Sequence, residues 1–279
     1  MAGAPDDAHP AESVFLQRLR AGQLTLMMLI RGSRTPEVVH VASSTGHHGI
    51  VIDLEHSPMS TDVAAMLCIV AGALEMTPLV RIPEREYGMI GRLLDGGAHG
   101  VVAPRIETVE QARAVTRACR FPPRGQRSQT TMVPQLGMRP TPAREMNPAL
   151  DHNVVVQILI ETTTGVENSD EIAALDGVDM IAIGANDLTA ELGVPGRYDD
   201  PRVRDWVETV ARACARHNKL LVVAGINDQA VYDDLAPLGL CPLVITGTDS
   251  ALLYQGAQAS VQRATAAFAG LAARDEDAT

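Results

Sequence analysis

The sequence predicts an α/β fold, a (β/α)8 (TIM) barrel, on three observations. Short apolar runs rich in Val, Ile and Leu alternate with longer amphipathic stretches, as repeated strand–helix units do. Most of the runs lack polar alternation, which is typical of parallel strands covered on both faces. The length of 279 residues suits one large barrel, because such barrels commonly reach about 200 to 250 residues.

Eight apolar runs supply the expected strands in chain order, at residues 24–30, 49–54, 78–82, 100–103, 154–160, 179–183, 219–223 and 243–246. Amphipathic stretches between them predict helices at 61–74, 87–96, 108–119, 201–217 and 228–238. No change in composition marks a second domain. We therefore expect one domain over residues 1–279, with short flexible tails at 1–9 and 272–279.

An open doubly wound sheet is the alternative architecture. When such a sheet binds a dinucleotide, a glycine-rich turn usually follows its first strand, but here Arg31-Gly32-Ser33-Arg34 follows that strand. No GxGxxG occurs at this point and no phosphate-binding GxxxxGKS or GxxxxGKT occurs anywhere, so nucleotide cofactors have no support. Only the long, proline-rich connection at 121–150 breaks the even spacing, and it predicts either a functional loop or lid or a poorly ordered excursion.

Composition and charge exclude several classes of partner. The chain has 23 basic and 34 acidic residues, a net charge of −11, and no basic stripe interleaved with aromatics, so nucleic acid is not an expected partner. The longest apolar stretch, at 63–74, is shorter than the roughly 20 residues of a membrane span, and the amino terminus lacks a secretory signal. We therefore expect a cytoplasmic protein with no membrane partner. Scattered cysteines without metal spacing predict reduced, mostly buried thiols at Cys68, Cys119, Cys214 and Cys241.

Polar side chains follow four of the expected strands. His56 lies just past the second strand, Arg81 at the end of the third, Glu161 after the fifth and Asp187 after the sixth. Residues at the carboxyl ends of barrel strands converge on one face, where barrel enzymes carry their active sites. We therefore expect a histidine, an arginine and two carboxylates to share one mouth.

Glu161 and Asp187 end neighbouring strands, whose backbones lie about 4.8 Å apart, so both carboxylates can reach one cation. A hard divalent ion such as Mg²⁺ or Mn²⁺ would complete its shell with water or substrate oxygens, which suits Lewis-acid catalysis. The alternative is that the carboxylates cap helix amino termini, as Asp187 could do before Leu188.

Arg81 and His56 each allow a structural interpretation and a catalytic one. Arg81 is either an ion-pair residue or, beside a metal, a group that stabilises oxyanion charge. His56 is either a satisfied hydrogen-bonding residue or, with a neighbouring acid, a general base. The remaining histidines considered lack a strand-end setting, and we expect structural or solvated roles for His47, His48, His99 and His217.

An ordered series of motifs resembles the HpcH/HpaI class II aldolases over roughly residues 20–265. The series begins with Ile-Asp-Leu-Glu-His-Ser-Pro at 52–58, Val-Arg-Ile-Pro at 80–83 and Leu-Leu-Asp-Gly-Gly-Ala at 93–98. It continues with Pro-Pro-Arg-Gly at 122–125, Ile-Glu-Thr at 160–162, Ile-Gly-Ala-Asn-Asp-Leu at 183–188 and Gly-Thr-Asp-Ser-Ala-Leu-Leu at 247–253. Each motif is weak singly, but the order is specific.

The resemblance implies a metal-dependent barrel enzyme, an aldehyde-lyase. It would reversibly cleave a 4-hydroxy-2-oxo acid to pyruvate, or a related 2-oxo acid, and an aldehyde through a metal-stabilised enolate. The implied cofactor is Mg²⁺ or Mn²⁺, or else Co²⁺, and the implied pathways include the catabolism of aromatic compounds or sugar acids. The implied assembly is a homohexamer, a trimer of dimers, in which neighbours exchange a carboxyl-terminal helix at 251–271.

The resemblance also implies roles for individual residues. Glu161 and Asp187 would bind the metal, and the backbone of Ala185, Asn186 and Asp187 would hold the substrate carboxylate. Arg81 would bind and polarise the 2-oxo group and stabilise the enolate. His56 would be the general base, paired with Asp95.

Two departures from the family pattern bear on the substrate. Leu159 stands where many members carry a glutamine that touches substrate, and Gly46-His47-His48-Gly49 replaces an aromatic-bearing segment. The only lysine, Lys219, begins the seventh strand on the wrong side of the barrel for a Schiff base.

Two other functions stay open: an oxaloacetate decarboxylase or enolate-addition enzyme on the same fold, and a barrel that binds a 2-oxo acid without turnover.

Overall fold

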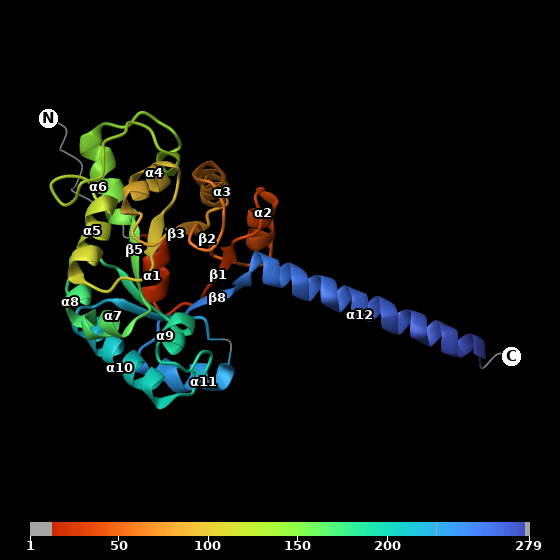
Figure 1. The fold of residues 1–279 in the computed structure, drawn as a ribbon. Coiled ribbons are helices and arrows are strands. Elements are labelled where there is room, and N and C mark those ends of the chain that lie inside the picture. The colour runs from red at the N-terminus through yellow and green to blue at the C-terminus, as the bar shows by residue number, and fades with distance from the viewer. Residues whose placement is uncertain (1–12, 227, 277–279) are drawn as a thin grey trace.

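The structure, a computed structural model, describes residues 13–226 and 228–276, without the side chains of 269–276. Its eight strands are parallel and form one sheet in the order β7-β6-β5-β4-β3-β2-β1-β8 (Figure 1). The strands are β1 Thr25–Ile30, β2 Gly49–Asp53, β3 Thr77–Arg81, β4 Gly100–Ala103, β5 Val155–Ile160, β6 Met180–Gly184, β7 Leu220–Ala224 and β8 Leu243–Thr248. All eight expected strands are confirmed within two residues at each end.

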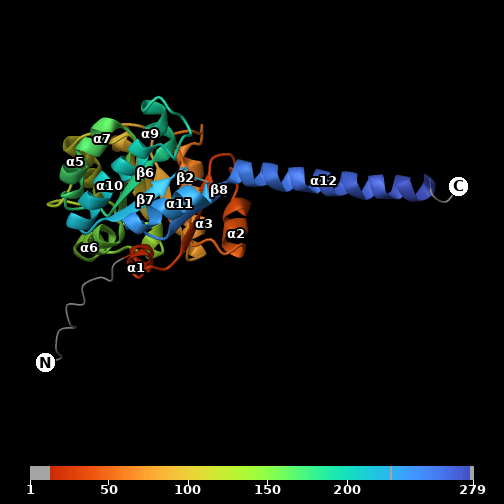
Figure 2. The same cartoon turned by 90° about the horizontal axis from the view of Figure 1, so that it is seen from below.

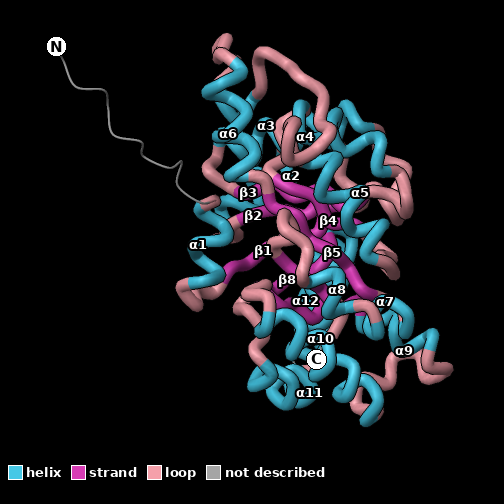
Figure 3. Tube along the Cα trace, turned by 90° about the vertical axis from the view of Figure 1, so that its left-hand side faces the viewer, coloured by secondary structure: helices cyan, strands magenta, loops and turns pink. Residues whose placement is uncertain are grey.

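Pairing of β8 with β1 rolls the sheet into a nearly closed barrel, with the helices outside it (Figure 3). Between β7 and β8 the described residues form no ladder, only a single bridge from Leu221 to Leu240 near their starts. The expected barrel is therefore confirmed, with one open seam.

The helices lie between the strands in the rhythm that the sequence predicts. They are α1 Val14–Arg20, α2 Glu37–Ser44, α3 Thr61–Ala73, α4 Ile90–Asp95, α5 Val109–Cys119, α6 Ala143–Asn153, α7 Thr163–Glu167, α8 Ser169–Ala173, α9 Ala185–Glu191, α10 Pro201–Arg216, α11 Gln229–Leu235 and α12 Asp249–Glu276. The expected helices correspond to α3, α4, α5, α10 and α11. Three of them begin at side-chain caps. Thr108 forms a capping box with Gln111 before α5, Asp200 accepts the Arg202 N–H at the start of α10, and Asp228 accepts the Ala230 N–H at the start of α11.

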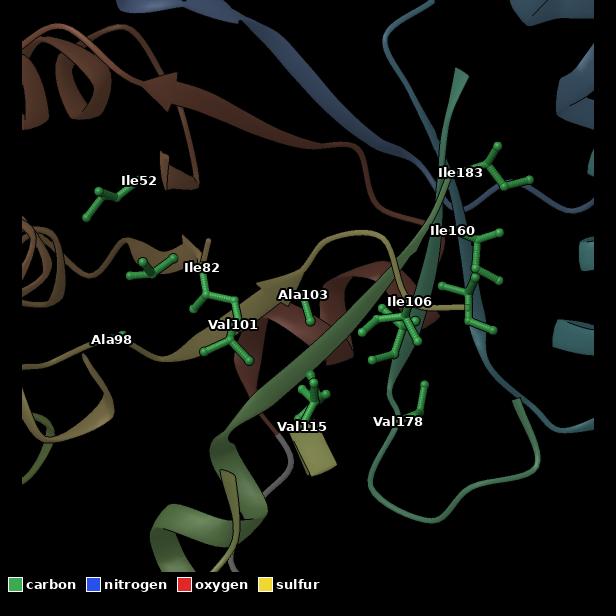
Figure 4. Packing of buried hydrophobic residues seen from close by; sticks show 14 of the residues in the cluster. Ile52, Ile82, Ala98, Val101, Ala103, Ile106, Val115, Ile160, Val178 and Ile183 are labelled. Carbon is green, nitrogen blue, oxygen red and sulfur yellow. The ribbon is translucent and has the colours of Figure 1, made fainter. Parts of the chain in front are cut away.

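Alternating residues of each strand pack against different partners. In β2, Ile50 and Ile52 belong to the outer core between strands and helices, whereas Val51 belongs to the core inside the barrel. Figure 4 shows the outer core, where Ile52 and Ile160 from strands and Val115 from α5 are buried. Phe15 of α1 is buried among the inward-facing residues. Burial on both faces is why the strands read as continuous apolar runs.

The segment 121–150 is neither a lid over the mouth nor an irregular excursion. It contains a short 3₁₀ helix, Pro134–Leu136, and most of α6. Because α5 runs back along the barrel, the segment starts at the amino-terminal ends of the strands, where Arg127, Gln135 and Leu150 line a cavity beside Thr77 of β3. The prediction of a lid is therefore wrong.

Helix α12 leaves the barrel after β8 and projects away from it (Figures 1 and 2). It carries large apolar side chains that are mostly exposed: Leu253, Tyr254, Val261 and Phe268. The helix includes 272–276 of the expected tail, whereas 277–279 and 1–9 lie outside the described residues. In the described part of the chain, no helix is long and apolar enough to span a membrane. All four cysteines are free and buried, as predicted.

Candidate active site

The candidate site lies at the carboxyl ends of β2, β3, β5 and β6. There the side chains that face the barrel interior change from apolar to polar. Side chains alternate along a strand, so Asp53 continues the inward row of Val51 in β2. Arg81 likewise continues the row of Leu79 in β3. By the same alternation, Glu161 follows the inward-facing Leu159 of β5. The barrel wall thus directs these polar groups into one mouth.

Asp53 and Arg81 form a two-point ion pair between neighbouring strands. The strand register places them opposite each other. Arg81 donates from Nε to Oδ1 of Asp53 at 3.0 Å and from Nη2 to Oδ2 at 2.6 Å, and Asp53 is fully buried. Burial alone would raise the pKa of Asp53, but the Arg81 hydrogen bonds and charge outweigh it and hold this pKa below its usual value. Arg81 keeps its charge, because Asp53 raises its pKa against the effect of burial.

Glu161 is a buried carboxylate in an acidic setting. Its side chain accepts the backbone N–H of Arg105 at Oε2, at 3.0 Å. Burial raises the pKa of Glu161 to about 7, and the negative charges of Asp187 and Glu55 add to this effect, while the Arg105 N–H and Arg81 oppose it. The carboxylate therefore lies in a site that favours an added positive charge.

The carboxylates of this cluster fit a divalent cation. Glu161 keeps Oε1 without a recorded hydrogen-bond donor in the described part of the chain, and Asp187 lies exposed in the first turn of α9. Gly184 leaves the room beside them, since a Cβ at this position would lie 2.6 Å from Oε1 of Glu161. The described residues contain no group of three or more candidate His, Cys, Asp or Glu ligands. Glu161 and Asp187 would therefore leave coordination positions for water or substrate oxygens, as hard cations accept.

The predicted pair of His56 and Asp95 does not form within the chain. The carboxylate beside His56 is Glu55, with Oε2 at 3.6 Å from Nε2. Asp95 is the last residue of α4, and a helix that follows a parallel strand runs back toward the strand's starting end. Its carboxylate accepts a 2.7 Å hydrogen bond from Arg127, which lines the cavity at the amino-terminal ends of the strands. Asp95 thus lies at the end of the barrel opposite the mouth.

The first turn of α9 is held by two further contacts. Asn186 accepts a hydrogen bond from the Tyr198 hydroxyl. Gly225, after β7, approaches Asn186 so closely that a Cβ there would lie 2.8 Å from its Nδ2. These contacts fix the turn whose backbone N–H groups lack acceptors within the helix. The predicted backbone of Ala185, Asn186 and Asp187 is therefore presented at the mouth in a defined position.

Several residues at the mouth were not assigned from the sequence. Asp53 and Glu55 were visible only as parts of a motif, and Tyr198 lies in the loop between α9 and α10 without a strand-end signal. Arg31 directly follows β1, so its strand-end position was a usable signal. Arg105 lies two residues after β4, so its strand-end position was also a usable signal. Leu159 is buried in the core inside the barrel, and Lys219 lies before β7 as expected, donating to the Val178 carbonyl.

Comparisons with known proteins agree with this geometry. Residues 26–236 match the family described as HpcH/HpaI aldolase/citrate lyase. The 4-hydroxy-4-methyl-2-oxoglutarate aldolase of Hapsidospora irregularis is 36% identical over 251 residues, 88% of this chain and 92% of that protein. An aldolase of the same name from Chaetomium globosum is 39% identical over 225 residues, 78% of this chain and 82% of its own. The crystal structure of an HpcH/HpaI aldolase from Desulfitobacterium hafniense superposes with a TM-score of 0.81 at 26% identity, covering 90% of this chain and 96% of that one.

Proposed function

The chain belongs to the HpcH/HpaI aldolase/citrate lyase family, and from this premise we propose how its mouth works as a class II aldolase. The reaction is cleavage of a 4-hydroxy-2-oxo acid to pyruvate, or a related 2-oxo acid, and an aldehyde. One observation carries the assignment of the site: the fixed guanidinium of Arg81 shares the mouth with the buried carboxylate of Glu161. The substrate names of the two relatives describe a 4-hydroxy-2-oxo acid, which supports this substrate class.

Glu161 and Asp187 would hold the divalent cation, with Mg²⁺ or Mn²⁺ the best match to two carboxylate ligands and Co²⁺ an acceptable substitute. A bound cation supplies Lewis-acid polarisation of the 2-oxo acid. The backbone N–H groups of Ala185, Asn186 and Asp187 at the start of α9 would bind the substrate carboxylate, because a helix amino terminus favours negative charge. The 2-oxo acid half is thereby placed between β3, β5 and β6.

Arg81 stabilises the charge that develops when the carbon–carbon bond breaks. The pair of electrons of the C3–C4 bond moves toward C2, and the 2-oxo oxygen becomes an enolate oxygen. A guanidinium already held by Asp53 needs no reorganisation to donate to that oxygen. Its Nη1 has no partner recorded in the described part of the chain.

His56 is the proposed general base. It takes the proton of the 4-hydroxyl group as C4 becomes the aldehyde carbonyl. It then returns that proton to C3 of the enolate, which releases the 2-oxo acid and restores the neutral imidazole. The half-exposed imidazole lies next to Glu55, whose Oε2 is 3.6 Å from Nε2. Asp95 of the same chain lies at the opposite end of the barrel. Glu55 is therefore the acid that positions the His56 imidazole within one subunit.

The assembly is proposed to be a homohexamer in which α12 exchanges between neighbours. The helix has 28 residues, and in the described residues its side chains between 253 and 268 are mostly exposed. Burial of exposed apolar side chains such as Leu253 and Phe268 against another subunit would stabilise an assembly. A trimer of dimers gives every α12 such a neighbour.

Hydrogen–deuterium exchange at the methyl group of pyruvate tests the proposed reaction without a choice of aldehyde. The enzyme in D₂O with Mg²⁺ or Mn²⁺ should exchange these hydrogens, as followed by proton NMR, and a chelator should stop the exchange. Glu161→Gln should abolish it while the far-UV spectrum stays unchanged. Turnover of oxaloacetate without exchange on pyruvate would favour the decarboxylase, and binding without exchange or turnover would favour a non-catalytic barrel.

A further inference from the structure

Arg31 lies at the mouth on a loop whose backbone is fixed. It follows β1, and its N–H donates to Oδ1 of Asp249, the first residue of α12, at 3.0 Å. The next two N–H groups, of Gly32 and Ser33, donate to the same carboxylate. These bonds outweigh burial and hold the pKa of Asp249 below its usual value, so the anion that fixes the loop persists. The start of the Arg31 side chain is therefore well defined.

The guanidinium of Arg31 is only partly satisfied by the protein. Nε lies 3.3 Å from Oδ2 of Asp53, and Nη2 donates to the carbonyl of His56 at 3.2 Å. Nη1 has no partner recorded in the described part of the chain, and the side chain is 40% exposed. This arginine thus keeps donors that face the mouth and solvent.

The charge of Arg31 is not neutralised by a carboxylate of its own. Asp53 already receives two hydrogen bonds from Arg81 and two from the backbone N–H groups of Glu55 and His56. Two guanidinium groups therefore share one buried carboxylate. A second anion beside Arg31 would complete this arrangement, and a planar guanidinium binds a carboxylate well through paired donors.

The location of Arg31 indicates which part of a substrate would supply that anion. The 2-oxo acid half is assigned to Arg81, Glu161 and Asp187, on β3, β5 and β6, whereas Arg31 touches His56, the base that acts on the 4-hydroxyl group. A group bound by Arg31 therefore belongs to the half that leaves as the aldehyde. We propose that Arg31 is the residue that binds a carboxylate on the half that leaves, and that it thereby sets the preference for a charged acceptor. The oxoglutarate substrates in the names of the two relatives carry such a second carboxylate. This inference rests on the proposed aldolase function.

Aldol addition of pyruvate to paired acceptors tests the inference. The acceptors are glyoxylate and succinic semialdehyde, which carry a carboxylate, and their neutral counterparts acetaldehyde and butanal. Wild type should give the higher kcat/KM with the charged member of each pair. Arg31→Met should lower the charged-to-neutral ratio of kcat/KM by about 10- to 100-fold, mainly through KM of the acceptor, and Arg31→Lys should restore part of it.

Arg85→Met is the matched control, because Arg85 is an exposed arginine on the loop after β3 whose recorded ion-pair partner is Glu84. It should leave the charged-to-neutral ratio unchanged. An unchanged ratio in Arg31→Met, an equal loss on neutral acceptors, or a wild-type preference for neutral acceptors would overturn the inference. Wild-type exchange of pyruvate hydrogens in the same samples keeps these outcomes distinct from failure of the aldolase function, which an absence of exchange would indicate.

Discussion

The carboxylate of Asp53 accepts both Nε and Nη2 of Arg81 from the adjacent strand, so the two last residues of β2 and β3 act as one rigid unit. This pairing fixes the plane of the guanidinium before any substrate arrives. The barrel thereby presents a positive charge at a defined place beside the acidic residues of β5 and α9.

Asp53→Asn should destabilise the fold at neutral pH. Removal of one partner of a buried ion pair typically costs about 3–5 kcal/mol. Because the folded state holds the pKa of Asp53 below its unfolded value, its stabilising contribution is present above pH about 4 and is lost as the pH falls through the folded-state pKa. Denaturant midpoints should therefore differ most at pH 7 and converge in acid. A difference that does not depend on pH would contradict the ion-pair explanation.

Glu161→Gln should weaken Mn²⁺ binding and lower turnover by at least about 10²-fold, the scale for loss of one electrostatic stabiliser in an active site. The amide keeps the size of the side chain but removes the charge. Calorimetric titration with Mn²⁺ and proton NMR of the exchange reaction measure the two effects. Normal Mn²⁺ affinity in this variant would remove Glu161 from the metal site.

Gly184→Ala should impair the same site through sterics alone. The added Cβ would lie 2.6 Å from Oε1 of Glu161, so the carboxylate must move away from its present position. We expect weaker Mn²⁺ binding and at least about tenfold slower exchange, because small misplacements of catalytic groups are costly. Gly91→Ala is the control, since apart from its chain neighbours and the backbone of its own helix no atom lies within 4 Å of its added Cβ. Equal effects of the two changes would argue against a positioned carboxylate.

Leu253→Asp combined with Phe268→Asp should reduce the molar mass in solution. Both side chains are about three-quarters exposed on α12, and a charge at each would oppose burial against a neighbouring subunit. Light scattering after size exclusion measures the mass. Gln258→Asp, on an already polar exposed position of the same helix, should leave the mass unchanged. A wild-type monomer would reject the exchanged helix altogether.

The sequence was sufficient to predict the strands and most of the mouth, for physical reasons. Strands buried on both faces are continuous apolar runs, and their ends placed Arg81 and Glu161 at one mouth. The sequence did not show where Asp95 lies, because its ion pair with Arg127 depends on the path of a long connection. Helix α6 was missed because the prolines around it, including Pro148 inside it, favour an irregular segment.

Contacts between distant parts of the chain were also beyond prediction. Asp249 lies 216 to 218 residues from the loop that it fixes, and no local pattern marks such a pair. The short helices α7, α8 and α9 are too brief to show a helical period. Arg31, in turn, acquires its significance only from the neighbours Asp53 and His56 that the fold brings to it.

The bond between Asp249 and the loop at 31–33 sets an order of events during synthesis. The loop emerges from the ribosome early, but its anchor emerges only after all eight strands, with the start of α12. Until then, a nascent chain can pair β1 with β2, yet Arg31 has nothing to hold its backbone. The mouth is therefore completed only after β8 has been synthesised, and a prematurely terminated chain that lacks Asp249 would carry Arg81 and Glu161 without an anchored Arg31.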